Sequence, residues 1–230
     1  MSWLPRARTM CLTVLLALAS AAALATAPTD AVSASTPSPP TEPHATASGP
    51  GCGTPERCFA RMTEAQKDVS SIRARFQQIK HVAMLTEPLV SGGRFVYRRP
   101  ASVRWEMETP EAMVVEIEGD ELRAGAPGSV SNVDAGQATT LFRDLAMLFT
   151  GAGDYTGDRF TLGPGTLGAD SFVLTPRDPS IGRVIAAIEI ALDPQTGGPR
   201  QVVIREANGD RTEITLSDVE VERARGGPAS

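Results

Sequence analysis

Alternation of apolar and polar residues is the dominant pattern of the chain from residue 72 onward. Ile72, Ala74 and Phe76 alternate with polar residues, and similar short apolar segments follow at regular spacing. Successive residues of a β-strand point to opposite faces, so this period of two predicts half-buried strands. After the first long strand, they are predicted at residues 89–97, 103–107, 112–118, 121–124, 159–162, 171–176, 187–192, 201–206 and 211–216.

Short turns separate these predicted strands. Gly119-Asp120 and Asn208-Gly209-Asp210 have the composition of tight hairpin turns, and Pro100 ends a strand because proline donates no ladder hydrogen bond. Consecutive strands with such short links predict antiparallel pairing rather than βαβ units. The expected fold class is mainly β with helices (α+β), built on a curved antiparallel sheet.

Two segments follow a helical period instead. Thr54 can cap a first helix with Pro55 at its first position, and Phe59, Met62, Val69 and Ile72 form its predicted apolar stripe. This helix should lead into the first long strand.

A second, amphipathic helix is predicted from Asp134 until Gly151 and Gly153 end it. It should lay its apolar face against the concave side of the sheet. The residues of that face are Ala138, Leu141, Phe142, Leu145, Leu148 and Phe149.

The N-terminal quarter of the chain has a different composition. Arg6 and Arg8 precede an apolar run that ends in Ala23-Leu24-Ala25, which predicts a secretory signal peptide over residues 1–25, with cleavage as late as residue 34 as an alternative. A permanent membrane anchor is disfavoured because the run is shorter than the roughly 20 residues that span a bilayer. Residues 26–51 are rich in Pro, Ser, Thr and Ala and predict a disordered tether. The folded domain should cover residues 52–223, followed by a loose tail over 224–230.

Charge and rare residues restrict the function. The 230 residues include 22 basic and 27 acidic side chains, with a net charge of −5, so no positive field favours nucleic acid. His44 falls in the tether and His81 near the end of the first long strand, so we expect no metal site. Cys52 and Cys58 are candidates for a local structural disulfide, because a redox pair would normally be Cys-x-x-Cys.

No motif predicts catalysis. Gly163 to Gly168 match the spacing G-x-G-x-x-G, but a strand follows where a nucleotide site needs a helix, which indicates a loop. Glu116 and Glu118 share one strand face and are interpreted as surface charge rather than a glycosidase pair. The remaining feature is apolar: the sheet and the second helix can pack into a plain core or enclose a binding cavity, and periodicity does not separate these alternatives.

The order of several short motifs resembles the LolA family, the periplasmic carriers of outer-membrane lipoproteins. The resemblance covers roughly residues 54–222, and the stretch 123–127 departs from the family's aromatic-rich pattern, which indicates a divergent branch. The matching stretches are Ser70 to Gln78, Ser91 to Pro100, Val103 to Glu106 with Pro110, Glu118 to Leu122, Phe172 to Pro176 and Asn208 to Thr212.

The resemblance implies an unclosed β-barrel with a helical lid and an apolar cavity for acyl chains. Arg99, the arginine before proline, would bond to the lid and help to hold the empty, closed state. The expected cavity residues are Phe76, Phe95, Tyr97, Val103, Trp105 and Met107 on the sheet, and Leu141, Leu145, Leu148 and Phe149 on the lid.

The expected function is a non-catalytic periplasmic carrier that shields the acyl chains of lipoproteins, or of a related lipid, on the way to the outer membrane. Its partners would be that cargo with an inner-membrane donor and an outer-membrane acceptor, and we expect a monomer without cofactor or nucleic acid. A lipid-binding sensor or assembly factor that acts on a protein partner is the alternative. A periplasmic hydrolase is disfavoured, because no nucleophile accompanies His81.

Overall fold

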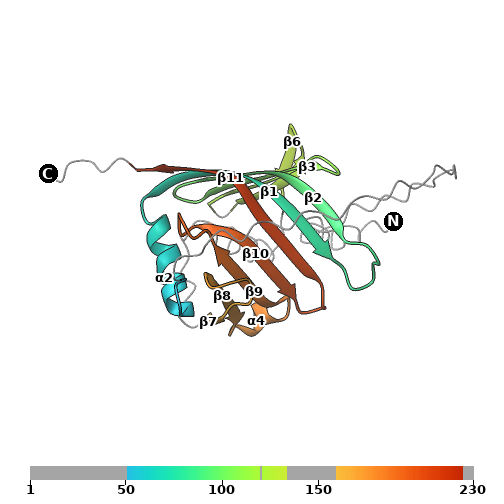
Figure 1. Ribbon diagram of the computed structural model, residues 1–230. Helices are drawn as coiled ribbons and strands as arrows, with labels where there is room; N and C mark the ends of the chain where they lie inside the picture. Colours follow the sequence, from blue (N-terminus) through green and yellow to red (C-terminus); the bar gives the residue numbers. More distant parts are fainter. Residues whose placement is uncertain (1–50, 120, 134–158, 225–230) are drawn as a thin grey trace, which may run out of the picture.

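A single antiparallel sheet of eleven strands dominates the part of the chain that the structure describes. The structure is a computed structural model, and it describes residues 51–119, 121–133 and 159–224. The strands run in the order β6-β5-β4-β3-β2-β1-β11-β10-β9-β8-β7, with β6 and β7 at the two edges. The sheet therefore curves into an unclosed β-barrel (Figure 1).

The first six strands form one run of neighbours and the last five form another, which meet where β1 pairs with β11. The strands are β1 (Val69–His81), β2 (Leu89–Arg98), β3 (Ser102–Thr109), β4 (Met113–Glu118), β5 (Glu121–Ala126), β6 (Ser129–Asn132), β7 (Phe160–Pro164), β8 (Ser171–Pro176), β9 (Ile185–Leu192), β10 (Pro199–Glu206) and β11 (Arg211–Arg223). The helices described are α2 (Pro55–Gln66) and α4 (Pro179–Gly182).

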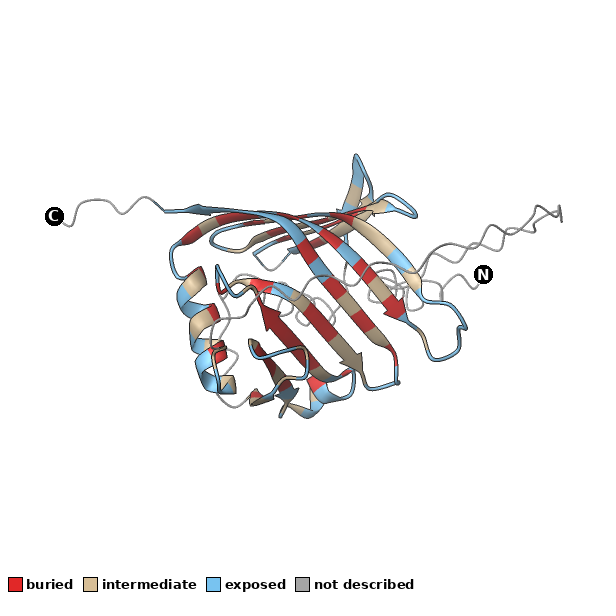
Figure 2. Cartoon of the chain, viewed as in Figure 1, coloured by how far each residue is buried: buried red, intermediate tan, exposed pale blue. Residues whose placement is uncertain are grey.

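The alternation along the sequence is reproduced in the burial of the strands. In β1, buried Ala74 and Phe76 alternate with exposed Arg73 and Arg75, and similar bands mark neighbouring strands (Figure 2). The predicted strand ranges are confirmed to within two residues at each end, except that β11 continues to Arg223, well beyond the predicted end at Leu216. The pattern did not predict β6, in which Val130 is the single apolar residue, or the four-residue helix α4.

The first helix is confirmed, but its predicted stripe extends too far. Helix α2 ends at Gln66, so Val69 and Ile72 belong to β1 and not to the helix. Their spacing happens to continue the helical period, whereas pairing of β1 with both β2 and β11 decides the conformation. The buried residues of α2 are Cys58, Met62 and Gln66.

Helix α2 begins beside a disulfide. Thr54 caps the helix by accepting a hydrogen bond from the Arg57 backbone N–H at 3.3 Å, and Cys52 is bonded to Cys58 with a Cα–Cα distance of 5.0 Å. The backbone N–H of Cys52 also donates to Asp170 Oδ1 at 3.0 Å, and Arg61 Nη1 lies 2.9 Å from the same oxygen. These contacts join the start of the domain to the loop before β8.

Reduction of this disulfide is expected to lower the free energy of unfolding by about 2 kcal/mol, because a short closed loop removes little entropy from the unfolded chain. Urea unfolding of the wild type with and without reductant measures the effect. The double variant Cys52→Ala/Cys58→Ala is the control and should not respond to reductant. An equal response of both proteins would contradict this explanation.

Candidate functional site

The inner face of strands β1, β2 and β3 carries an aromatic cluster. Phe76 and Trp105 have ring centroids 4.2 Å apart, and those of Phe95 and Trp105 are 5.6 Å apart. The register explains this contact, because Phe95 lies directly opposite Trp105 across the β2–β3 pair. All three rings are almost completely buried.

All six sheet residues predicted for the site lie in one buried apolar cluster. Phe76, Phe95, Tyr97, Val103, Trp105 and Met107 are each at most 8% exposed. The alternation explains this arrangement, because each of these residues has the inward phase within its strand. Leu141, Leu145, Leu148 and Phe149, predicted for the lid, lie outside the described residues, as does the whole helix predicted from Asp134.

The same cluster continues onto strands β8 and β9, which the site prediction left out. Phe172 and Leu174 of β8 and Ile188 and Ile190 of β9 are fully buried in it. Phe59 of α2 packs edge-on against Phe172, with ring centroids 5.8 Å apart. Alternation within 171–176 could have identified the buried residues of β8, but not that they join those of β3.

Arg99 contacts the C-terminal end of helix α2. Its Nη2 donates to the backbone carbonyls of Lys67 at 2.8 Å and Gln66 at 3.3 Å. The last carbonyls of a helix have no partner within the helix and carry the negative end of its dipole, so a guanidinium is favourable there. Since α2 has no basic residue in its own last turn, Arg99 supplies this charge from the sheet.

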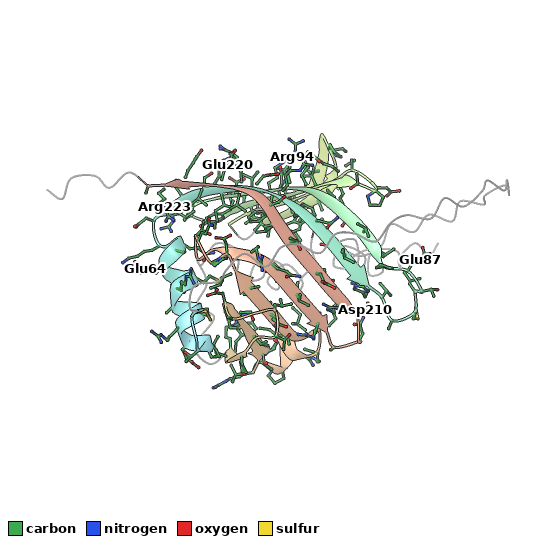
Figure 3. The ribbon with its side chains drawn as sticks, in the orientation of Figure 1. Glu64, Glu87, Arg94, Asp210, Glu220 and Arg223 are labelled. Carbon is green, nitrogen blue, oxygen red and sulfur yellow. A yellow bond between two sulfur atoms is a disulfide. The ribbon has the colours of Figure 1, made fainter. Side chains whose placement is uncertain are left out.

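A second arginine reaches the same helix end. Arg223, the last residue of β11, donates from Nη1 to the Ala65 carbonyl at 2.9 Å (Figure 3 labels Arg223 above this end of α2). Arg99 and Arg223 are far apart in sequence: Arg99 directly follows β2 and Arg223 ends β11, the two strands on either side of β1. The sequence prediction missed Arg223, because nothing in the local pattern shows which helix end a distant arginine will reach.

One end of the inner face is ionic rather than apolar. Lys80 follows Phe76 in the inward phase of β1, and its side chain is only 4% exposed. Its Nζ lies 2.8 Å from Glu206 Oε1 and 3.9 Å from Asp210 Oδ2. Asp210, at the turn between β10 and β11 (Figure 3), also accepts a hydrogen bond from the Ala83 backbone N–H at 3.0 Å. The alternation along β1 did not predict this cluster, although Lys80 has the same phase as the preceding buried residues Ala74 and Phe76.

A second buried charge organises the loop between β7 and β8. The carboxylate of Glu189 accepts hydrogen bonds from the backbone N–H groups of Thr166 and Leu167, from the Thr166 hydroxyl and from Arg205 Nη1. Burial by itself raises the pKa of Glu189, but these hydrogen bonds outweigh it, so its pKa lies below the usual value. The glycine-containing segment 163–168 therefore holds a carboxylate of its own chain.

The described residues contain no arrangement typical of a metal centre. Among them, no three His, Cys, Asp or Glu side chains gather as potential metal ligands. The paired carboxylates of the sequence analysis have a simple explanation in the structure, because Glu116 forms ion pairs with Arg104 and Arg123, and Glu118 is exposed. None of the helices in these ranges is long and apolar enough to cross a bilayer.

The fold and the site together define a class of protein: an unclosed antiparallel β-barrel with a large apolar inner cluster and a helix held at its side. A family model, described as outer membrane lipoprotein carrier protein LolA, matches residues 67–225. The chain belongs to this family. A search of curated proteins found no match to it.

Solved structures of low sequence identity resemble the chain. A LolA superfamily protein from Nitrosomonas europaea is 11% identical, with a TM-score of 0.41, over 75% of this chain and 95% of the other. The lipoprotein LppX from Mycobacterium tuberculosis is 13% identical, with a TM-score of 0.39, over 71% of this chain and 95% of the other. The Pseudomonas aeruginosa MucA/MucB complex contains a chain that is 15% identical, with a TM-score of 0.33, over 74% of this chain and 57% of the other.

Proposed function

We propose that this protein is an exported, non-catalytic carrier that shields the acyl chains of lipoproteins, or of a related lipid, in the periplasm. The observation that carries the proposal is the aromatic cluster of Phe76, Phe95 and Trp105 on the inner face of an unclosed sheet. Membership of the LolA family supports the same class of cargo. Delivery from an inner-membrane donor to an outer-membrane acceptor is part of the proposal.

The energy of such a site is sufficient for acyl chains. Each buried CH₂ group contributes about 0.8 kcal/mol, so a sixteen-carbon chain offers about 11 kcal/mol before any cost of opening is subtracted. A carrier must also release its cargo, so part of this energy has to be offset by contacts that form again in the empty protein. We propose that the helical cover, including Leu141, Leu145, Leu148 and Phe149, supplies those contacts.

Native mass spectrometry of protein purified gently from its own periplasm tests the proposal. We expect an adduct with the mass of an acylated protein for a lipoprotein carrier, and one with the mass of a lipid for a lipid carrier. Mild delipidation should remove the adduct and leave a folded protein. A bare protein that also fails to bind purified diacylated lipoprotein in vitro would contradict the proposal.

Arg99→Leu is expected to retain cargo. Loss of the hydrogen bonds to Gln66 and Lys67 removes a contact that holds the end of α2, which should weaken the empty, closed state by roughly 1–2 kcal/mol and slow release about 5- to 30-fold. The measurement is the rate of transfer of a labelled lipoprotein to acceptor membranes.

Arg98→Leu is the matched control, because Arg98 is the exposed neighbouring residue and neither α2 carbonyl accepts from it. It should release cargo at the rate of the wild type. If the Arg99 and Arg98 variants are indistinguishable, the contact with α2 does not set the balance between loaded and empty protein.

A further inference from the structure

The hydroxyl of Tyr97 is buried without a hydrogen-bond partner. Tyr97 is 0% exposed, and its oxygen has no hydrogen-bond partner among the residues that the structure describes. In the sheet it lies opposite Ile72 of β1 and Val103 of β3, two buried apolar residues. The polar atom therefore lies in the same apolar cluster as Phe95, two residues earlier in β2.

A buried polar group of this kind is unfavourable unless another group pairs with it. A buried hydroxyl has lost its hydrogen bonds to bulk water, and no group of the described residues replaces them. A phenylalanine at this position would have the same shape and would avoid that cost. The hydroxyl is therefore expected to find its partner in a molecule that binds beside it.

We propose that the Tyr97 hydroxyl donates a hydrogen bond to an ester carbonyl of the bound cargo. This inference rests on the proposed function, because it assigns the position of an acyl chain that this function requires. In an ester-linked chain the carbonyl oxygen is the strong acceptor next to the methylenes, so it is the atom that enters an apolar cluster together with them. The apolar residues opposite Tyr97 favour a neutral acceptor over a free carboxylate, which would be buried there without a positive partner.

The hydrogen bond gives the site a chemical preference that apolar area alone does not provide. Ester-linked and ether-linked chains of equal length bury nearly the same surface, but the ether lacks the carbonyl oxygen. The protein should therefore prefer esters, and the preference should depend on one hydroxyl. Both the diacylglyceryl group of a lipoprotein and a diacyl phospholipid carry this ester.

Tyr97→Phe tests the assignment. Binding is measured for dipalmitoyl phosphatidylethanolamine, for its dihexadecyl ether analogue and for a dipalmitoylglyceryl-cysteine lipopeptide. We expect the variant to lose roughly 2- to 12-fold in affinity for the two esters, the value of one net hydrogen bond, and none for the ether. The ester probe for which the affinity falls more in the variant identifies the source of the natural cargo.

Two controls separate this role from a structural one. Ser71→Ala removes another buried hydroxyl without a partner, next to Ile72 in β1, and should leave all three affinities unchanged. The melting temperature of ligand-free Tyr97→Phe should equal or exceed that of the wild type, because no hydrogen bond is lost. A lower melting temperature would show a structural partner and overturn the assignment.

The remaining outcomes distinguish the two proposals. A wild type that binds the ester and the ether equally, or a variant that keeps the ester preference, overturns the role of Tyr97 and leaves the carrier function intact. A wild type that binds none of the three probes overturns the carrier function and the assignment with it.

Discussion

Replacing Glu189 with alanine is expected to lower the free energy of unfolding by about 1–3 kcal/mol. Glu189 is 0% exposed, and its removal leaves Arg205 and the backbone N–H groups of Thr166 and Leu167 without their acceptor. The Arg205 side chain is 43% exposed and can be hydrated, so the expected effect is that of removing the acceptor of hydrogen-bonded loop groups rather than of breaking a fully buried ion pair. Urea unfolding at neutral pH measures it.

Glu118→Ala is the matched control for this variant. Glu118 is an exposed carboxylate at the end of β4, so its removal should change the free energy of unfolding by about 0.5 kcal/mol or less. If Glu189→Ala changes the free energy of unfolding as little as Glu118→Ala does, the loop between β7 and β8 does not depend on the carboxylate.

The contribution of Glu189 should also depend on pH in a defined direction. Its pKa in the folded protein lies below the ordinary value of 4.5 for a glutamate, so the folded state favours the charged form more than the unfolded state does. The stabilisation is complete above about pH 4.5 and is lost as the pH falls through the lower, folded value. Asp178 and Asp193 also have lowered pKa values, so the wild type alone does not isolate Glu189.

Comparison with Glu189→Gln isolates this one carboxylate. The difference in unfolding free energy between the wild type and the variant should shrink between pH 5 and pH 2, because only the wild type loses the charge at this position. A difference that stays constant over this range would show that the charge of Glu189 is not what the loop recognises.

Trp105→Ala is expected to cost about 3–5 kcal/mol and to weaken cargo binding. Trp105 contacts both Phe76 and Phe95, and truncation leaves a cavity between their rings. The same ring is proposed as the wall against which an acyl chain lies, so affinity should fall in the fraction of protein that remains folded. Chemical denaturation and binding of a fluorescent acyl probe measure the two effects separately.

Trp105→Phe is the control for the second effect. It keeps an aromatic ring against Phe76 and Phe95 and should lose less than half of the stability lost by the alanine variant. Folded Trp105→Ala that binds the probe as tightly as the wild type would remove this cluster from the cargo site and leave it as a plain core.

Local patterns predicted the elements of this protein well because each depends on neighbouring residues. Alternation identified β1 and β3 because one face of each strand is buried and the other is solvated, and Thr54-Pro55 identified the start of α2 because capping is a local interaction. Strand β6 was not predicted, because its four mostly polar residues show no alternation of apolar and polar positions. The stripe through Val69 failed because helical spacing occurred by chance where strand pairing was stronger.

The sequence by itself determined the class of fold, the inward phase of Phe76, Phe95 and Trp105, and the family to which the chain belongs. Only the tertiary structure decided that β1 pairs with β11, that Arg99 and Arg223 meet the end of α2, and that the Glu189 carboxylate is held by a glycine-containing loop. The reason is physical: burial of alternate residues is set by hydrophobicity along one strand. The partner of a charge is set instead by which distant segments the curvature of the sheet brings within about 3 Å.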